Sequence, residues 1–448
     1  MKIRIKKKIS IYNLAFGFVL CLDLLSGYFG GSTVGFGWAS PLWNLGIMAM
    51  FAAILLEYCA NKHFDRRTVR ILLVGGIIFV GFLAVSCICG IDRGYARKNL
   101  LTICKVTVAE ISIFMLANSR HFNFFQELKK NFWLFNFWGF LNMIVLTIQI
   151  NVKGFMMPSA WLSMNTYYED LCSGLFGYNG THRLSIYMTF LFLYNMYFAE
   201  FEIQKESKQK KLYIYNFFLL GWHFMLSTRN DNMTIYMLTA IFFAAYIFMD
   251  MHWRKYPIAK TLYKCLKYVA VGLLAVIIVF AVPTTREFIM DGVIKRIMKL
   301  TTVTASTGSG STERLSILLY SFENGFGYGI GKGIGYFPFG GDWETNSSVV
   351  GFRHFGLSSM SSLIYLLGIW FYLFYTLWIT KIYQGMCRHK DAIFFFVILC
   401  IMLFLTFYTT NFTSTPMSTC LMMLFAVFCM MEEKIRMDRT LWRMQKEN

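Results

Sequence analysis

A series of long apolar segments, separated by short polar ones, constrains this chain more than any other feature. An α-helix needs about 20 apolar residues to cross the hydrocarbon core of a bilayer, because each residue adds only about 1.5 Å along its axis. The composition agrees, since 56% of the residues are hydrophobic and only 15% are charged, against about 25% charged residues in soluble domains. The pattern excludes a soluble globular enzyme, a disordered protein and a fibrous protein, and it predicts an all-α integral membrane protein.

The segments predict twelve spans of the cell membrane (inner or plasma membrane), with both chain termini in the cytoplasm. Cytoplasmic loops collect Lys and Arg, and this topology places 28 of the 43 Lys and Arg residues on that side and 13 outside. The bias accounts for the net charge of +19, and no nucleic-acid-binding motif is present, so a nucleic acid partner is not expected. The predicted spans are 10–29, 40–59, 71–90, 100–119, 132–150, 184–201, 212–228, 233–249, 265–283, 358–380, 392–410 and 414–431.

Two predicted external segments are too long to be simple connections between spans. One covers 151–183. The other is the large external loop, 284–357. It separates a first helical region, 1–283, from a last helical region with a basic cytoplasmic tail, 358–448. Near-helical spacing of apolar residues over 288–300 predicts an amphipathic helix lying on the membrane surface.

The second half of the large loop combines a turn, a helix and a glycine-rich run. The turn at 307–312 can cap a helix that begins near Thr312 and covers 313–322. The glycine-rich run, 325–341, has no GxGxxG in register, and Gly331-Lys332 is followed by Gly instead of Ser or Thr, so a nucleotide-binding loop is rejected. Two interpretations stay open: a backbone loop close to a phosphate or sugar, and a plain mobile loop.

External arginines are the main candidates for a binding site, because membrane topology does not explain them. Arg229 lies in a tight turn that holds it near the membrane surface. Arg314 falls in the first turn of the predicted helix, where free backbone N–H groups stabilise an anion, and Gly325 completes an RX10G pattern with it. A guanidinium is always charged and can bind a phosphate through two parallel hydrogen bonds. Ordinary contact with lipid headgroups is the alternative. The four external arginines that we select as candidates are Arg183, Arg229, Arg314 and Arg353.

Other ionisable residues leave more than one interpretation. External carboxylates can serve as a general base, but nothing in the sequence selects one. His354 and His182 are external, and each is either a base or a structural residue. Lys105 and Glu110 lie in one predicted span, where they are either functional or a buried structural pair. The 11 cysteines form no CxxC pair, so neither a zinc site nor a redox motif is expected.

This organisation resembles the O-antigen polymerase and ligase superfamily, in particular the Wzy-type polysaccharide polymerases. The resemblance rests on Ser227-Thr-Arg229 in an outer turn, and on Glu313-Arg-Leu315 followed by the glycine-rich segment 325–331 in the large loop. Arg183 resembles the arginine that closes the first long external loop of the family. The ligase branch has a His-Asn pair after the glycine segment, whereas this chain has Arg353-His-Phe355 there, which favours a polymerase.

The resemblance implies that the enzyme joins oligosaccharide repeat units carried on undecaprenyl diphosphate into a capsule, exopolysaccharide or O-antigen on the outer face of the membrane. Its partners would be the lipid-linked oligosaccharide, the bilayer, a chain-length regulator and a flippase. It implies no cofactor, and since the sequence shows no cluster of metal-binding carboxylates, we expect catalysis without a metal. The catalytic residues expected are Arg229, Arg314 and His354, and the substrate-binding residues are Arg183, Arg353, Gly325 and Gly327.

Three other functions compete with the polymerase. One is an O-antigen-ligase-like glycan transferase. The second is a flippase for lipid-linked oligosaccharides, which would need charged residues along a central cavity within the bundle; here the arginines outside the cytoplasmic side lie at the external face. The third is a large polyprenyl-phosphate glycosyltransferase, which usually carries acidic metal-binding residues in its first external loop; residues 30–40 contain no Asp or Glu.

Overall fold

The computed structural model describes most of the chain, and everything reported below refers to these residues. They are 45–56 (without 47, 50 and 54), 66–89, 93–119, 123–156, 172–177, 180–254 (without 231 and 233), 290, 313–326, 330–339, 350–352, 355–387, 391–412 and 415–447.

The described residues are helical and contain no strand, which confirms the all-α expectation for this part of the chain. The long helices are α3 (Arg66–Cys89), α4 (Arg93–Ala117), α6 (Phe132–Asn151), α8 (Thr181–Tyr197), α9 (Glu206–Arg229), α10 (Thr234–Arg254), α16 (Ser359–Gly385), α17 (Ala392–Tyr408) and α18 (Thr415–Glu447). The shorter ones are α5 (Phe124–Lys130), the 3₁₀ helices η2 (Gly174–Phe176) and η5 (Phe355–Leu357), the π-helix η3 (Phe198–Glu202) and α14 (Glu313–Phe326).

Nine of the twelve predicted spans fall on observed helices. Five helices are long and apolar enough to cross a membrane, namely α3, α4, α6, α10 and α16. The predicted spans 10–29 and 265–283 lie outside the described residues, and 40–59 is described only in part. The count of twelve spans, the orientation of the termini and the division of the chain at 284 and 357 therefore stay predictions. The same holds for the amphipathic helix at 288–300.

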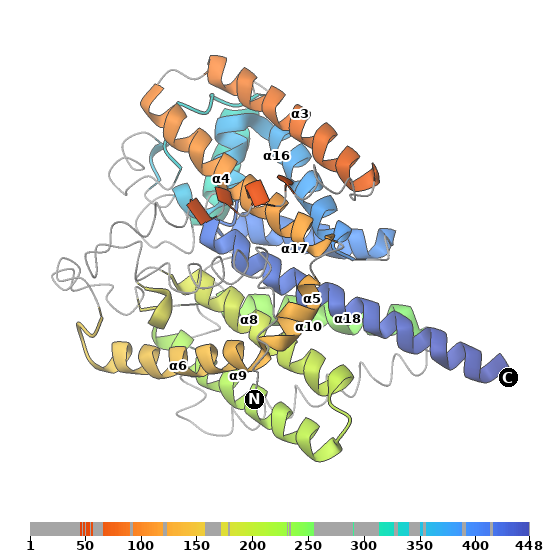
Figure 1. Cartoon of the computed structure of the whole chain (residues 1–448). Helices are drawn as coiled ribbons and strands as arrows, with labels where there is room; N and C mark the ends of the chain where they lie inside the picture. The colour runs from red at the N-terminus through yellow and green to blue at the C-terminus, as the bar shows by residue number, and fades with distance from the viewer. Residues whose placement is uncertain are drawn as a thin grey trace, which may run out of the picture.

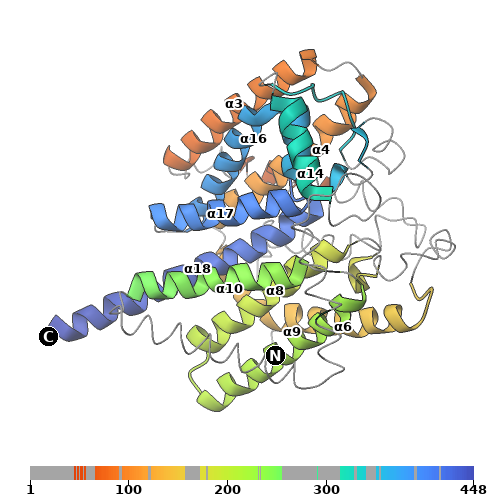
Figure 2. The same cartoon turned by 180° about the vertical axis from the view of Figure 1, so that it is seen from behind.

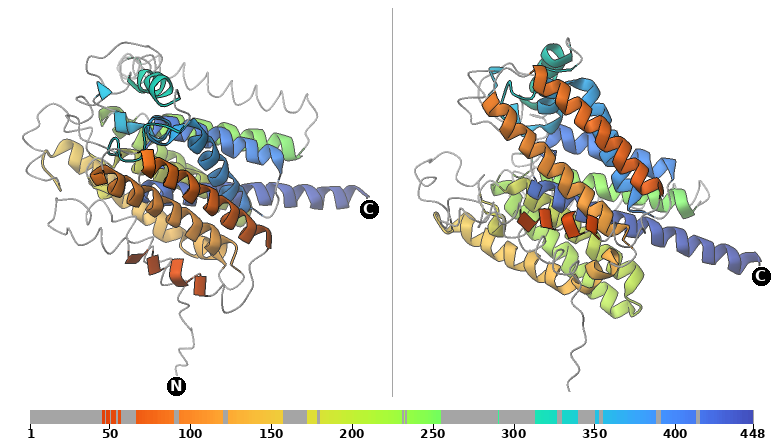
Figure 3. Two further views of the ribbon diagram at one scale, coloured as in Figure 1. Left: turned by 90° about the horizontal axis from the view of Figure 1, so that it is seen from above. Right: turned by 45° about the horizontal axis from the view of Figure 1, so that its top comes forward.

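Helix α18 runs through the middle of the molecule and organises the other helices around it. Figures 1 and 2 show α3, α4, α14 and α16 on one side of it and α6, α8, α9 and α10 on the other, with α17 alongside. The side chains from 420 to 432 are all buried, as expected for a helix that is apolar on every face. The C-terminal part of α18 extends beyond the other helices in Figure 3.

Polar side chains of α4 and α6 hold two loops onto the bundle. Asn142 Oδ1 of α6 accepts a hydrogen bond from the backbone N–H of Leu175 at 2.5 Å, and Gln149 Oε1 accepts one from Gly174 at 2.8 Å. Asn99 of α4 does the same for the glycine-rich segment: its Nδ2 donates to the carbonyl of Phe337 at 2.6 Å, and its Oδ1 accepts from the N–H of Phe339 at 2.8 Å.

A break in α16 at Gly368 (φ 87°, ψ 164°) completes the attachment of the glycine-rich segment. The break leaves carbonyl groups of α16 without helical partners, and the N–H groups of Lys332 and Gly333 each donate to one of them at 2.9 Å, on Tyr365 and Leu366. Gly331 has φ 73°, and a Cβ on it would lie 2.6 Å from the Leu366 oxygen. The described part of this segment, 330–339, is therefore packed backbone with fixed hydrogen bonds.

Candidate functional site

Buried and half-buried polar groups from four elements meet at one end of the bundle, where α8, α10 and α14 begin and α17 ends. The C-terminus of α18 marks the opposite end in Figure 1, and Figure 2 shows α14 lying across α16 with one end beside α17. The predicted Arg-bearing helix 313–322 is confirmed as α14, Glu313–Phe326. Its first turn carries Arg314 into this region.

Arg314 is a buried cation. Its residue is 7% exposed, its guanidinium carbon lies 4.3 Å from the centre of the Tyr408 ring, and its buried Nε has no hydrogen-bond partner among the described residues. In the same part of the chain no carboxylate forms an ion pair with it. A charge removed from water is stable only when it is paired or hydrogen-bonded, so the arrangement favours an anionic ligand.

His182 also contacts the ring of Tyr408. Its Nδ1 lies 2.5 Å from Oγ1 of Thr234, the first residue of α10, and its ring meets Tyr408 edge-on with the centroids 6.1 Å apart. His182 precedes the predicted span 184–201. Burial, together with the positive charge of Arg314, lowers the pKa of His182 to about 3. The imidazole is therefore neutral at pH 7 and has one nitrogen able to accept a proton.

The turn between α9 and α10 fixes these two helix starts relative to each other. Asn232 Nδ2 donates to the carbonyl of Thr181 at 3.0 Å, and its Oδ1 accepts from the Ser185 hydroxyl at 2.7 Å. Asn230 Nδ2 donates to the carbonyl of Cys172 at 2.9 Å. Since Asn232 bonds to α8 on both sides of His182, the turn holds this histidine near Thr234.

Arg229 and Arg183 lie at the same end with different partners. Arg229 is exposed, and its Nη1 donates to Oδ1 of Asn151 at the end of α6, at 3.0 Å. Arg183 follows His182 and donates from Nη2 to the carbonyl of Phe176 at 3.3 Å. Whether Arg229 and Arg314 act on one ligand stays a prediction, as does the role of Arg183.

Gly325 has a packing role at the far end of α14. A Cβ there would lie 2.6 Å from the carbonyl oxygen of Ile364 in α16, so only glycine allows the two helices to approach this closely. Its predicted role in substrate binding stays a prediction. Gly327, Arg353 and His354 lie outside the described residues.

Asn411 adds a buried amide that the sequence did not single out. It lies three positions after Tyr408, it is fully buried, and neither its Oδ1 nor its Nδ2 has a partner among the described residues. The chain just after α17 is held in place, because the carbonyl of Thr409 accepts a hydrogen bond from the N–H of Ser359 at 2.9 Å. An unsatisfied buried amide favours a polar ligand for the same reason as the unpaired guanidinium does.

Sequence reasoning missed Tyr408, Thr234 and Asn411, and it weighed His182 without selecting it. Tyr408 is one of 25 tyrosines and lies at the end of an apolar span, where aromatic residues are common. No local motif distinguishes these residues. Among the described residues there is no group of three or more His, Cys, Asp or Glu side chains that could hold a metal ion. The chemistry available at this site is therefore cationic, hydrogen-bonding and proton-accepting.

The chain was compared with family models, with curated proteins and with solved structures. No family model, no curated protein and no solved structure matches it.

Proposed function

We propose that this protein polymerises undecaprenyl-diphosphate-linked oligosaccharide repeat units on the outer face of the membrane. The observation that carries the proposal is Arg314, a buried guanidinium with no carboxylate partner among the described residues, at the end of a helical bundle. A diphosphate group on a lipid reaches such a site from within the bilayer, and its negative charge would compensate the cation.

The same charge would assist the reaction. When the sugar leaves its lipid carrier, the diphosphate gains negative charge in the transition state. A preorganised donor in a site without water stabilises such a charge by about 3–4 kcal/mol. Arg314 is held by the ring of Tyr408, so little reorganisation is needed when the charge develops. A guanidinium does this without a metal.

The other residues selected from the sequence are proposed as further parts of this site. Arg229 and His354 are proposed as further catalytic residues, and Arg183, Arg353, Gly325 and Gly327 as substrate-binding residues. Twelve spans with both termini in the cytoplasm would place Arg314 and Arg229 outside, where completed repeat units arrive. A flippase would deliver these units, and a chain-length regulator would act on the product.

The test replaces Arg314 by Ala and by Lys and measures the length of lipid-linked and surface glycans in cells. Both variants are expected to lose long polymer, because Lys cannot reproduce a planar bidentate donor. Single repeat units should still reach the outer face. Arg97→Ala is the matched control, because Arg97 is an exposed arginine near the start of α4, and it should leave chain length unchanged.

Two results would redirect the proposal. Single units accumulating only inside the cell would support a flippase. Normal chain length in both Arg314 variants would remove this site from the reaction.

A further inference from the structure

We propose that His182, oriented by Thr234, accepts the proton of the acceptor sugar hydroxyl in this reaction. The inference rests on the proposed function and adds a catalytic residue to it. It assigns the general base, which the sequence alone did not identify. It stands on the contacts of the imidazole ring and on the residues that face it.

The imidazole ring contacts both Thr234 and Tyr408. Nδ1 contacts Thr234 Oγ1 at 2.5 Å, and the ring edge meets the same Tyr408 ring whose face carries Arg314. Among the described residues Nε2 has no hydrogen-bond partner. With the proton on Nδ1 and donated to Thr234, Nε2 presents a free lone pair.

This placement matches the two halves of a glycosyl transfer. The diphosphate would bind to the guanidinium of Arg314. The acceptor hydroxyl would bind to His182, which contacts the same tyrosine ring. Asn411 follows Tyr408 by three positions, and its buried amide, unpartnered among the described residues, would supply a further donor and acceptor for the sugar.

The step balances without any other reactant. The acceptor oxygen forms a bond to the anomeric carbon, and the bond from that carbon to the diphosphate oxygen breaks with its electron pair going to the diphosphate. The hydroxyl proton moves to Nε2 of His182 and is later released to water. Burial is the larger cause of the low pKa of His182 and the charge of Arg314 the smaller one. A diphosphate beside Arg314 would offset the second cause, so the histidine becomes a better base once the substrate is bound.

The first experiment separates binding from turnover. His182→Gln keeps a hydrogen-bonding group near the Nε2 position but cannot take up a proton, and His182→Asn keeps one near Nδ1. Both are expected to lower polymer formation in cells about 100-fold or more, the lower range for a general base. The affinity of the purified, membrane-reconstituted protein for a short polyprenyl diphosphate should stay within about 2-fold, whereas Arg314→Ala should abolish it.

These outcomes distinguish the two proposals. Normal binding of the probe by Arg314→Ala overturns the proposed function. If Arg314→Ala loses binding but His182→Gln polymerises normally, the proposed function stands and the role of His182 is wrong.

The second experiment tests the orientation of the ring and does not change the histidine. Thr234→Val removes the hydroxyl at nearly constant volume, and Thr234→Ser keeps it. We expect Thr234→Val to lower polymer formation about 10-fold, the low end for loss of a supporting partner, with unchanged probe binding, and Thr234→Ser to restore it. Equal activity of the Val and Ser variants would show that the contact with Thr234 does not orient the base.

Discussion

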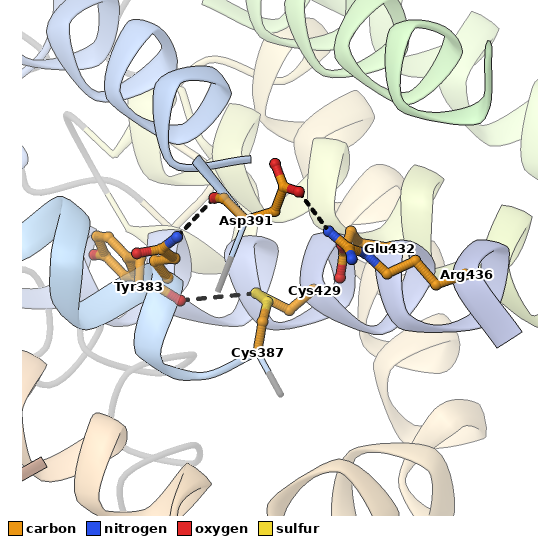
Figure 4. The surroundings of a disulfide bond; sticks show 7 residues. Tyr383, Cys387, Asp391, Cys429, Glu432 and Arg436 are labelled. Atoms are coloured by element: carbon orange, nitrogen blue, oxygen red, sulfur yellow. Dashed lines mark hydrogen bonds and ion pairs between the residues drawn. A yellow bond between two sulfur atoms is a disulfide. The ribbon is translucent and has the colours of Figure 1, made fainter. Parts of the chain in front are cut away.

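Two arginines rest on aromatic rings at opposite ends of the bundle, and their surroundings differ. Arg436 lies over Trp253 at 3.5 Å and also pairs with Glu432 and, at 3.4 Å, with Asp391. Arg314 lies over Tyr408 in the same manner but has no carboxylate partner among the described residues. Figure 4 shows Arg436 and both of its carboxylates near the bridge between Cys387 and Cys429.

The difference separates a structural cation from one that is available to a ligand. At Arg436 two carboxylates balance the charge, and the pairing joins α10, α17 and α18. At Arg314 the ring contact orients the guanidinium, and no carboxylate of the described residues pairs with it. Ring stacking is common to both ends, so stacking alone does not identify a binding site. A binding site is identified by whether a carboxylate pairs with the stacked arginine.

The largest expected effect is on stability at the Arg436 end. Arg436→Met leaves Glu432, which is fully buried, without its cation. Breaking a buried pair in this way costs about 3–5 kcal/mol, so the thermal midpoint of the purified protein should fall clearly. The double variant Arg436→Met with Glu432→Leu should recover much of the loss, and a double variant no more stable than the single one would contradict the pairing argument.

The next largest effect is stabilisation by an anion at the Arg314 end. A ligand that binds only the folded state at 100 times its dissociation constant adds about 2.7 kcal/mol. Inorganic pyrophosphate or a short polyprenyl diphosphate should therefore raise the thermal midpoint of the wild-type protein and of the Arg97→Ala control. Arg314→Met should remove this rise without lowering the midpoint in buffer. A rise that persists in Arg314→Met would place the anion elsewhere.

The smallest effects concern the rings beneath the two guanidinium groups. A cation above an aromatic face gains about 0.5–2 kcal/mol. Tyr408→Leu should weaken binding of the diphosphate probe by up to about 30-fold, while Tyr408→Phe keeps the face and should bind normally. Trp253→Leu should lower the thermal midpoint and leave probe binding unchanged. If Tyr408→Leu acted only on stability, the two ends would not differ as argued.

Much of the helical framework was predictable, because it follows from local patterns. The predicted helix 313–322 appears as 313–326, and nine predicted spans coincide with helices. The placement of Arg314 at a helix start came from the same reasoning. Its partners did not, since Tyr408, His182 and Thr234 belong to three other elements and no sequence period connects them.

The arrangement of the glycine-rich run was also not predictable from local sequence. Sequence left open a loop near a phosphate and a mobile loop. The structure shows that the described residues 330–339 are bonded to Asn99 and to the broken turn of α16 at Gly368, and closeness to a phosphate or sugar stays a prediction. A break in one helix and an amide on another decide this arrangement, and neither is visible in the run itself.

The sequence by itself determined that this chain forms apolar helices, where nine of them lie, and that Arg314 begins a helix in a long connecting segment. These follow from hydrophobic length and local hydrogen bonding, which act over a few turns of chain. Only the tertiary structure decided that one arginine is paired with two carboxylates, and that the other has no carboxylate partner among the described residues. The charge balance of a buried group depends on which helices pack against it, and packing joins residues that are distant in the sequence.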